Sequence, residues 1–227
     1  MLRWKEERQG ETALLIEGAR RIGKSTIVEE FAKNEYSSYI LVDFSKTATE
    51  INDLFNDLSD LNYIFLRLQL NYNVSLKERK SLIIFDEVQN NPKARQAIKH
   101  LVKDHRYDYI ETGSLISIRK NVQNIIIPSE ETRITMHPMD FEEFRWAMGD
   151  NVSFTLLKTV LEKKQPLGEA IHRKLMRDFR LYMLVGGMPQ AVDKYIKTNN
   201  LSAVDTVKRD IIALYEEDLR KIETSGK

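Results

Sequence analysis

The feature that most constrains the fold is residues 14–26, where the chain reads LLIEGARRIGKST. A short apolar run leads into Gly18, and Gly23, Lys24 and Ser25 follow at the spacing G-x-x-x-x-G-K-[ST]. Behind them apolar residues recur at helical spacing, at Ile27, Val28, Phe31 and Ala32. A strand, a glycine-containing loop and a helix in this order are typical of a loop that cradles phosphate groups. The alternative interpretation is a chance glycine turn before a helix.

The residue types in this loop suit phosphate binding. A helix N-terminus presents unpaired N–H groups and a partial positive charge. Gly18 and Gly23 let the backbone approach the phosphates and adopt φ values that other residues resist. Lys24 adds a mobile charge for the β- and γ-phosphates, and Ser25 offers a hydroxyl to Mg²⁺. Thr26 adds a second hydroxyl, close to the expected α-phosphate.

A second motif lies in residues 81–89, which read SLIIFDEVQ. The apolar run in residues 82–85 is typical of a parallel strand that is buried on both faces. It ends in Asp86 and Glu87, and buried carboxylates are costly unless they are paired or bind a metal. We interpret Asp86 as a Mg²⁺ ligand through water, opposite Ser25, and Glu87 as the group that orients the attacking water. The alternative is a strand that ends in a solvated acidic turn.

A third short motif follows the next predicted strand, residues 107–111. There the chain continues with Thr112, Gly113 and Ser114. The carboxyl ends of parallel strands line the ligand site in open α/β sheets, so Thr112 or Ser114 is positioned to sense the γ-phosphate. The same three residues are also common in loops, and that alternative stays open.

Arg133 begins a predicted short strand, residues 133–136. One interpretation is an arginine that neutralises charge developing on the transferred phosphate. The favoured alternative is a surface salt bridge with Glu130 or Glu131, and no arginine is marked as such a finger by its spacing alone.

The order of the motifs predicts an α/β fold, a P-loop NTPase with a three-layer parallel sheet and a C-terminal all-helical lid. We place the P-loop ATPase domain at residues 1–137. Residues 138–227 are expected to form the helical lid. Within the first part, residues 119–132 read as a connector with one β-like run, Ile125–Ile127. A basic helix face around Arg177 is interpreted as solvated, and nucleic-acid contact is the alternative.

Composition narrows the classes of protein. Among 227 residues there is no cysteine, which excludes disulfides and thiolate metal sites and agrees with a cytoplasmic protein. No apolar run reaches the 18 or so residues of a membrane span, and the charged N-terminus lacks a signal-peptide core. The formal net charge is +1, so nothing global indicates nucleic-acid binding.

The chain resembles a large group of prokaryotic AAA-type ATPases. The runs GARRIGKST, LIIFDEVQ, TGS, PMDFEEF and GGMPQAV occur in that family in the same order, and the last two are its most specific motifs. The resemblance covers nearly the whole chain. In longer members the P-loop domain is followed by a helical region and then a nuclease-like domain. This chain stops soon after RDIIALYEEDLRK, so the resemblance implies that residues 138–227 also contain the start of a truncated C-terminal domain. We therefore expect a fragment, a truncated gene product or a C-terminally shortened member.

The resemblance also implies roles for individual residues. ATP would be bound by nine consecutive residues: Gly18, Ala19, Arg20, Arg21, Ile22, Gly23, Lys24, Ser25 and Thr26. Mg²⁺ would be bound by Ser25 and Asp86. The catalytic set would be Lys24, Asp86, Glu87 and Ser114, with Thr112 as the alternative to Ser114 as sensor.

We therefore expect an ATP-binding, Mg²⁺-dependent AAA-type ATPase that acts as a nucleotide-driven conformational switch. The first alternative is a non-hydrolysing ATP-binding module in a complex with DNA or protein. The second is a P-loop kinase for a small molecule, against which the adjacent Asp86 and Glu87 argue, because they favour hydrolysis. The expected partner besides ATP is a protein or DNA rather than a membrane, and a homo-oligomer stays open.

Overall fold

The computed structural model describes residues 1–114 and 129–224. The chain divides into two compact units. The first, here called the sheet unit, comprises residues 1–19 and 23–136, and the second, the helical unit, comprises residues 20–22 and 137–227. The predicted β-like run Ile125–Ile127 lies outside the described residues. That the two parts act as an ATPase domain and a lid stays a prediction.

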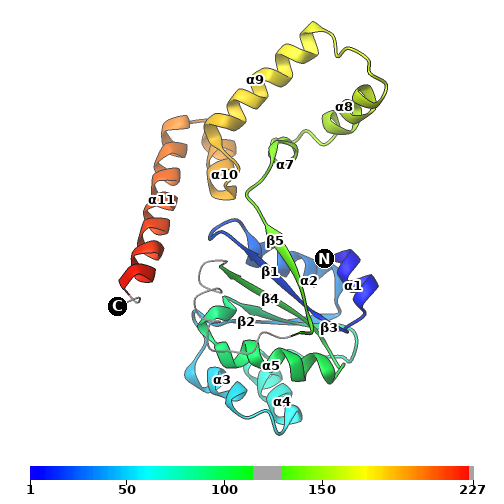
Figure 1. Cartoon of the computed structure of the whole chain (residues 1–227), viewed down its shortest axis with the longest axis vertical. Coiled ribbons are helices and arrows are strands. Elements are labelled where there is room, and N and C mark those ends of the chain that lie inside the picture. Colours follow the sequence, from blue (N-terminus) through cyan, green and yellow to red (C-terminus); the bar gives the residue numbers. More distant parts are fainter. Residues whose placement is uncertain (115–128, 225–227) are drawn as a thin grey trace. The chain divides into compact units, whose positions relative to one another are not determined.

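The sheet unit is built on a five-stranded parallel sheet with the order β2-β3-β4-β1-β5 (Figure 1). Its strands are β1 (Ala13–Gly18), β2 (Ser38–Asp43), β3 (Ser81–Asp86), β4 (Asp108–Ser114) and β5 (Glu131–Met136). All six residues of β3 and all seven of β4 are buried. The predicted α/β fold with a parallel sheet and C-terminal helices is confirmed. The order places β4 between β3 and β1, so the strands that carry the two main motifs are not neighbours.

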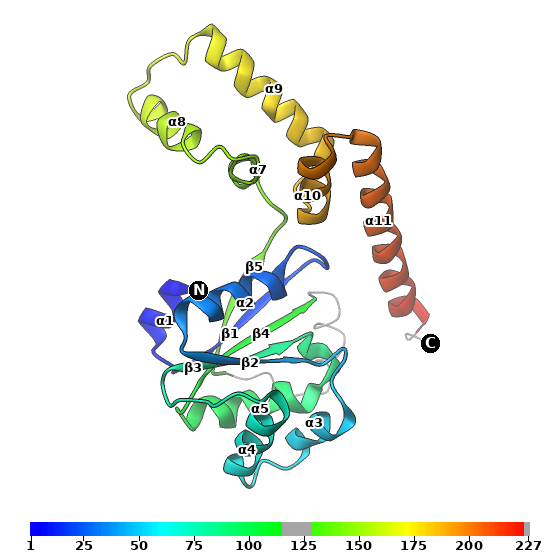
Figure 2. The ribbon, with the colours of Figure 1, turned by 180° about the vertical axis from the view of Figure 1, so that it is seen from behind.

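Helices cover both faces of this sheet and complete three layers (Figure 2). The first face is covered by α1 (Leu2–Arg8) and α2 (Lys24–Glu35). The other is covered by α3 (Thr49–Asp53), the 3-10 turn Leu54–Asn56, α4 (Leu61–Tyr72) and α5 (Pro92–Lys103). The alternation of side chains along each strand explains the two cores. In β3, Leu82 and Ile84 pack toward α2, whereas Ile83 and Phe85 pack toward α5.

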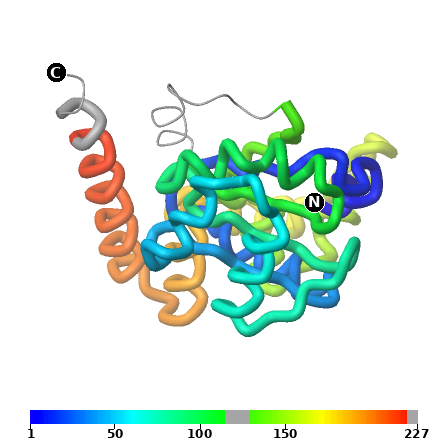
Figure 3. The backbone as a smooth tube through the Cα atoms, turned by 90° about the horizontal axis from the view of Figure 1, so that it is seen from below, coloured from blue at the N-terminus to red at the C-terminus, as the bar shows by residue number. Residues whose placement is uncertain are grey.

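The helical unit consists of helices with a small core. They are α7 (Phe141–Ala147), α8 (Ser153–Glu162), α9 (Glu169–Val185), α10 (Pro189–Thr198) and α11 (Leu201–Thr224). Asp140 caps α7, and its partner in the capping box is Glu143. The longest helix, α11, runs without a break (Figure 3). Across residues 1–114 and 129–224, we find no helix whose length and apolar character would let it span a membrane.

The two most specific runs of the sequence, PMDFEEF and GGMPQAV, meet in the helical unit. The Met139 N–H donates a hydrogen bond of 2.8 Å to the carbonyl of Gly187. The Tyr182 hydroxyl donates to the Met139 carbonyl at 2.9 Å. A Cβ on Gly187 would lie 2.0 Å from that same carbonyl oxygen, so only glycine permits this approach. These runs therefore hold the helical unit together, and their specificity has a structural cause.

Candidate functional site

The predicted phosphate loop joins β1 to α2. Gly23 has φ of 92° and forms the N-cap of α2, and Arg21 also lies in the left-handed region, with φ of 64°. Gly18 differs from the prediction, because it ends β1 in extended conformation and pairs with Ser114 and Met136. Gly23 is therefore the glycine of this loop that adopts an unusual φ, because Gly18 is still paired within the sheet.

The start of α2 offers backbone donors. In the described part of the chain, no acceptor takes up the N–H groups of Gly23, Ser25 or Thr26. The first N–H groups of a helix have no intrahelical partner and carry its positive dipole end, so they suit an anion. Among the other predicted loop residues, Ala19, Arg20, Arg21 and Thr26 are exposed and Ile22 is buried.

Lys24 is the buried cation of the loop. Its side chain lies beneath the loop and donates to the carbonyl oxygens of Gly18 at 3.2 Å and Ala19 at 2.8 Å. Only 5% of the residue is exposed. A charge held by carbonyl groups in the loop is available to the phosphates that such a loop encloses.

The carboxylate of Asp86 connects three elements. Its Oδ1 accepts a hydrogen bond of 2.7 Å from the Ser25 hydroxyl, at the start of α2. The same oxygen accepts a hydrogen bond from the Thr112 hydroxyl, on β4. A hydroxyl and a carboxylate are hard oxygen ligands of the kind that Mg²⁺ prefers. Ser25 and Asp86 therefore fit a magnesium ion, although they lie 61 residues apart in sequence.

Glu87 has a strained backbone. It adopts φ of 53° and ψ of 45°, which is uncommon for a residue other than glycine. Its N–H donates to the Thr112 hydroxyl at 3.3 Å, and its carboxylate accepts a hydrogen bond from the Gln89 amide. Such strain persists only where neighbouring contacts hold it, and it is frequent at functional sites. Gln89 had no role in the sequence interpretation. The one sequence signal for its contact with Glu87 was its position two residues after that carboxylate.

The residues Thr112, Gly113 and Ser114 belong to β4 and not to a loop. They continue the strand because they pair with β1, where Ile16 lies opposite Thr112 and Gly18 lies opposite Ser114. Thr112 thus contacts the Asp86 carboxylate, whereas Ser114 is buried beside the end of β1. The structure brings both sensor candidates to the site from one strand, each at a different part of it.

Comparison with known protein families shows which family the chain belongs to. Residues 10–145 match the family described as AAA domain, which is more than half of the chain. The chain belongs to this family. AAA domains are ATPase-type nucleotide-binding domains, in agreement with the loop, the carboxylate pair and the sheet. Residues 176–227 match a second family, described as a domain of unknown function.

Comparison with individual proteins adds little to this assignment. No curated protein matches the sequence. Among solved structures, one titled "Structure of C. elegans PCH-2" is similar with a TM-score of 0.46 and 11% sequence identity. That alignment covers 89% of this chain and 62% of the other. The present chain therefore spans less than two thirds of the length of that protein.

Arg133 of the AAA domain lies in the middle of β5, opposite Leu15. Its Nε is 2.6 Å from Oε1 of Glu131, so a salt bridge with Glu131 is present. The predicted salt bridge is therefore confirmed with Glu131; the Arg133 side chain is half exposed, whereas that of Glu131 is only 1% exposed. Its other oxygen lies 3.0 Å from Nη2 of Arg95, whose side chain is equally buried. In this structure Arg133 is engaged toward the start of β5, away from the strand's carboxyl end.

A buried carboxyl group completes this charged cluster in the AAA domain. Glu111 of β4 is fully buried, and neither of its oxygens has a hydrogen-bond partner among residues 1–114 and 129–224. Burial raises the pKa of Glu111 well above its ordinary value, while the nearby charge of Arg95 opposes this rise. The sequence interpretation missed Glu111, because a single carboxylate in an apolar strand has no motif around it.

Glu111→Gln is expected to raise the Tm at pH 8 by about 2–4 °C, the shift that roughly 1 kcal/mol produces in a chain of this size. The folded-state pKa lies above the unfolded value, so the native state binds the proton more tightly. The stability contributed by Glu111 is thus present below the unfolded pKa and is lost as the pH rises toward the folded pKa. The gain should therefore shrink at pH 4.5, which thermal unfolding at both pH values would measure.

The exposed Glu78→Gln is the matched control and should leave the Tm nearly unchanged at both pH values. A Glu111→Gln variant that is less stable than the parent at pH 8, or equally shifted at both pH values, would contradict the buried neutral carboxyl.

Proposed function

We propose that the chain is a Mg²⁺-dependent ATPase domain that uses bound nucleotide to change conformation. The observation that supports this most is the 2.7 Å contact between the Ser25 hydroxyl and the Asp86 carboxylate. It joins the helix after the phosphate loop to the end of the buried strand β3. The AAA family of the domain agrees with ATP as the nucleotide.

The phosphate chain would be bound by the loop from Gly18 to Thr26. The donors are the N–H groups of Gly23, Ser25 and Thr26 and the ammonium of Lys24, which would exchange its carbonyl contacts for phosphate oxygens. Ser25 and Asp86 would hold Mg²⁺. When bound, this ion supplies charge neutralisation at the phosphate oxygens.

Glu87 would act on the attacking water. As a carboxylate beside the phosphate site, it would orient the water and accept its proton as the water oxygen bonds to the γ-phosphorus, while the bond from that phosphorus to the bridging oxygen breaks and ADP leaves. The left-handed backbone at Glu87 aims this side chain, and the Thr112 hydroxyl supports it by accepting the Glu87 N–H. Thr112 and Ser114 are the sensor candidates. A movement of the Asp86 carboxylate would shift Thr112, because the two side chains share a hydrogen bond.

The conformational change requires parts that can respond separately. Division of the chain into a sheet unit and a helical unit supports this role.

One observation favours a second candidate, an ATP-binding module that does not hydrolyse. The Glu87 carboxylate accepts a hydrogen bond from the Gln89 amide at Oε2, one of the two oxygens that could contact the water. In that case ATP would stabilise one conformation and would not turn over until a partner released Glu87.

The test is to measure nucleotide binding and phosphate release by the purified chain, with Mg²⁺ and with a chelator. We expect ATP binding and slow turnover that stops when Mg²⁺ is removed. Binding without turnover would favour the second candidate. A chain that binds neither ATP nor ADP would refute both.

A further inference from the structure

The helices α8 and α9 of the helical unit contribute almost nothing to a buried core. In the described structure α8 has no buried residue, and the one buried residue of α9 is Val185, at its end. Large apolar side chains are instead open to solvent, with exposed fractions of 59% for Leu156 and 58% for Ile171. Amphipathic helices normally bury their apolar face, so an unburied one indicates a surface that is covered by something else.

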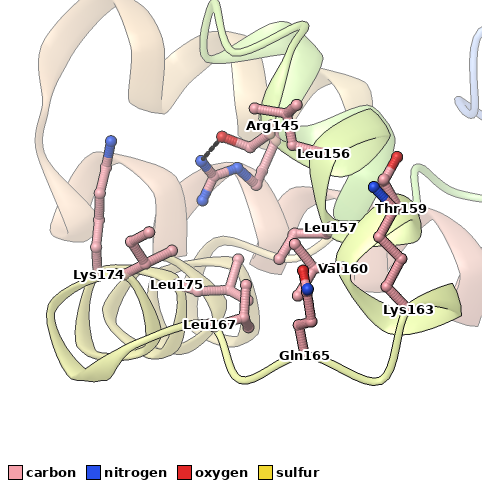
Figure 4. Close-up of a pocket in the computed structure, with 12 residues that line it drawn as sticks. Arg145, Leu156, Leu157, Thr159, Val160, Lys163, Gln165, Leu167, Lys174 and Leu175 are labelled. Carbon is pink, nitrogen blue, oxygen red and sulfur yellow. Dashed lines mark hydrogen bonds between the residues drawn. The ribbon is translucent and has the colours of Figure 1, made fainter.

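A cavity of about 550 Å³ lies between these two helices. Figure 4 shows Leu157, Val160, Leu167 and Leu175 gathered at its centre, with Lys174 on one side and Lys163 on the other. A cavity of this size can admit a few apolar side chains, and its lining resembles that of binding pockets in general.

The wall of the cavity is held in place by Arg145. Only 5% of this residue is exposed, and its guanidinium donates to Asp178 of α9 at 2.6 Å. It also donates to Asp150 and, at 3.2 Å, to the Ser153 hydroxyl at the start of α8. Arg145 thus links α7, α8 and α9, so the cavity is formed by side chains with specific contacts.

The rim of the cavity is basic. Residues 153–185 contain seven Lys and Arg but three Asp and Glu, although the whole chain has a net charge of only +1. Two of the three acidic residues, Glu169 and Asp178, already pair with arginines. Lys163 and Lys174 form no ion pair with any residue in the described ranges. The surface therefore presents apolar side chains flanked by two lysines that have no acidic partner within the described part of the chain.

We propose that this surface, formed by Leu156, Leu157, Val160, Ile171 and Leu175 with Lys163 and Lys174, binds an acidic amphipathic helix of a partner protein. Apolar anchors on one helix face would enter the cavity, and carboxylates beside them would face the two lysines. A nucleic acid fits less well, because phosphates would meet the lysines but leave the leucines in water. The inference does not depend on ATP hydrolysis.

The probe is a fluorescent peptide of about 18 residues, with Leu at helical i, i+3, i+4 and i+7 spacing and Glu at the other face. We expect micromolar binding by anisotropy, about −8 kcal/mol. A scrambled peptide of the same composition should bind at least tenfold more weakly. Lys163→Glu/Lys174→Glu should also weaken binding at least tenfold, since like charges repel. The milder Lys163→Gln/Lys174→Gln should give an intermediate loss.

The matched control is Lys99→Glu/Lys103→Glu, which makes the same change of charge on exposed positions of α5, in the sheet unit. It should bind the peptide within about twofold of the parent. Equal binding of the scrambled peptide, or equal loss in both charge-reversed variants, would overturn the proposal.

Two other ligands of this surface, DNA and a second copy of this chain, would give different results in experiments on the same samples. A DNA duplex that binds more tightly than the peptide and is lost in Lys163→Glu/Lys174→Glu would overturn the proposal in favour of nucleic acid. A dimer of the parent in sedimentation experiments that Leu156→Asp separates would overturn it in favour of a second copy of this chain.

Discussion

Glu87→Gln is expected to lower the rate of ATP hydrolysis by about 10²-fold to 10⁴-fold, the usual contribution of a general base. Glutamine keeps the shape of the side chain but cannot take a proton from water. ATP affinity should stay nearly unchanged, because the groups proposed to bind the phosphates belong to the loop before α2 and do not include Glu87. Steady-state phosphate release, with binding of a fluorescent ATP analogue measured on the same sample, would show whether turnover is lost without binding.

Two variants separate this effect from a general loss of the site. Lys24→Ala removes the buried ammonium of the loop and should lose nucleotide binding together with turnover. The exposed Glu78→Gln should behave like the parent protein in both assays. If Glu87→Gln hydrolyses ATP at the rate of the parent, then Glu87 is not the group that activates water.

Arg95→Met is expected to lower the free energy of unfolding by about 3–5 kcal/mol, the cost of removing one partner of a buried ion pair. Arg95 and Glu131 are both 1% exposed and lie 3.0 Å apart. Without Arg95, the ion-pair partner left to Glu131 among the described residues is the half-exposed Arg133, and Glu111 loses the positive charge that most opposes the rise of its pKa. Chemical denaturation of parent and variant, with and without saturating ATP, would measure the loss.

The control is Arg3→Met, at an exposed arginine that pairs with Glu7 one helical turn away. Exposed pairs contribute about 0–1 kcal/mol, so this change should be nearly silent. In Arg95→Met/Glu131→Gln no buried charge is stranded at position 131, and part of the lost stability should return. A loss below about 1 kcal/mol for Arg95→Met alone would show that the buried Glu131 carboxylate does not depend on Arg95 for compensation.

The local elements of this protein follow from its sequence. The apolar run before Asp86 predicted a strand buried on both faces, and all six residues of β3 are buried. Asp140 is followed three residues later by Glu143, the sequence signature of a capping box, and the two residues form one at the start of α7. Such features depend on neighbours in the chain, because side-chain alternation and capping involve residues only a few positions apart.

Other features depended on pairing between distant segments. Thr112, Gly113 and Ser114 have the composition of a loop, yet they lie in β4 because β1 pairs with them. Gly18 was expected to need an unusual φ, and pairing through the end of β1 keeps it extended. The contact between Gln89 and Glu87 was missed as well, since it depends on the left-handed turn at Glu87.

The sequence by itself determined where the glycine loop before α2 and the acidic pair after β3 lie, and its continuous apolar run at residues 82–85 predicted a buried parallel strand. Only the tertiary structure decided which polar groups meet inside. Arg95 and Glu131 lie 36 residues apart and become partners because α5 packs against the sheet beside β5. Hydrophobic periodicity specifies which face of an element is buried. A buried charge, in contrast, is stable only beside an opposite charge, and folding decides which residue supplies it.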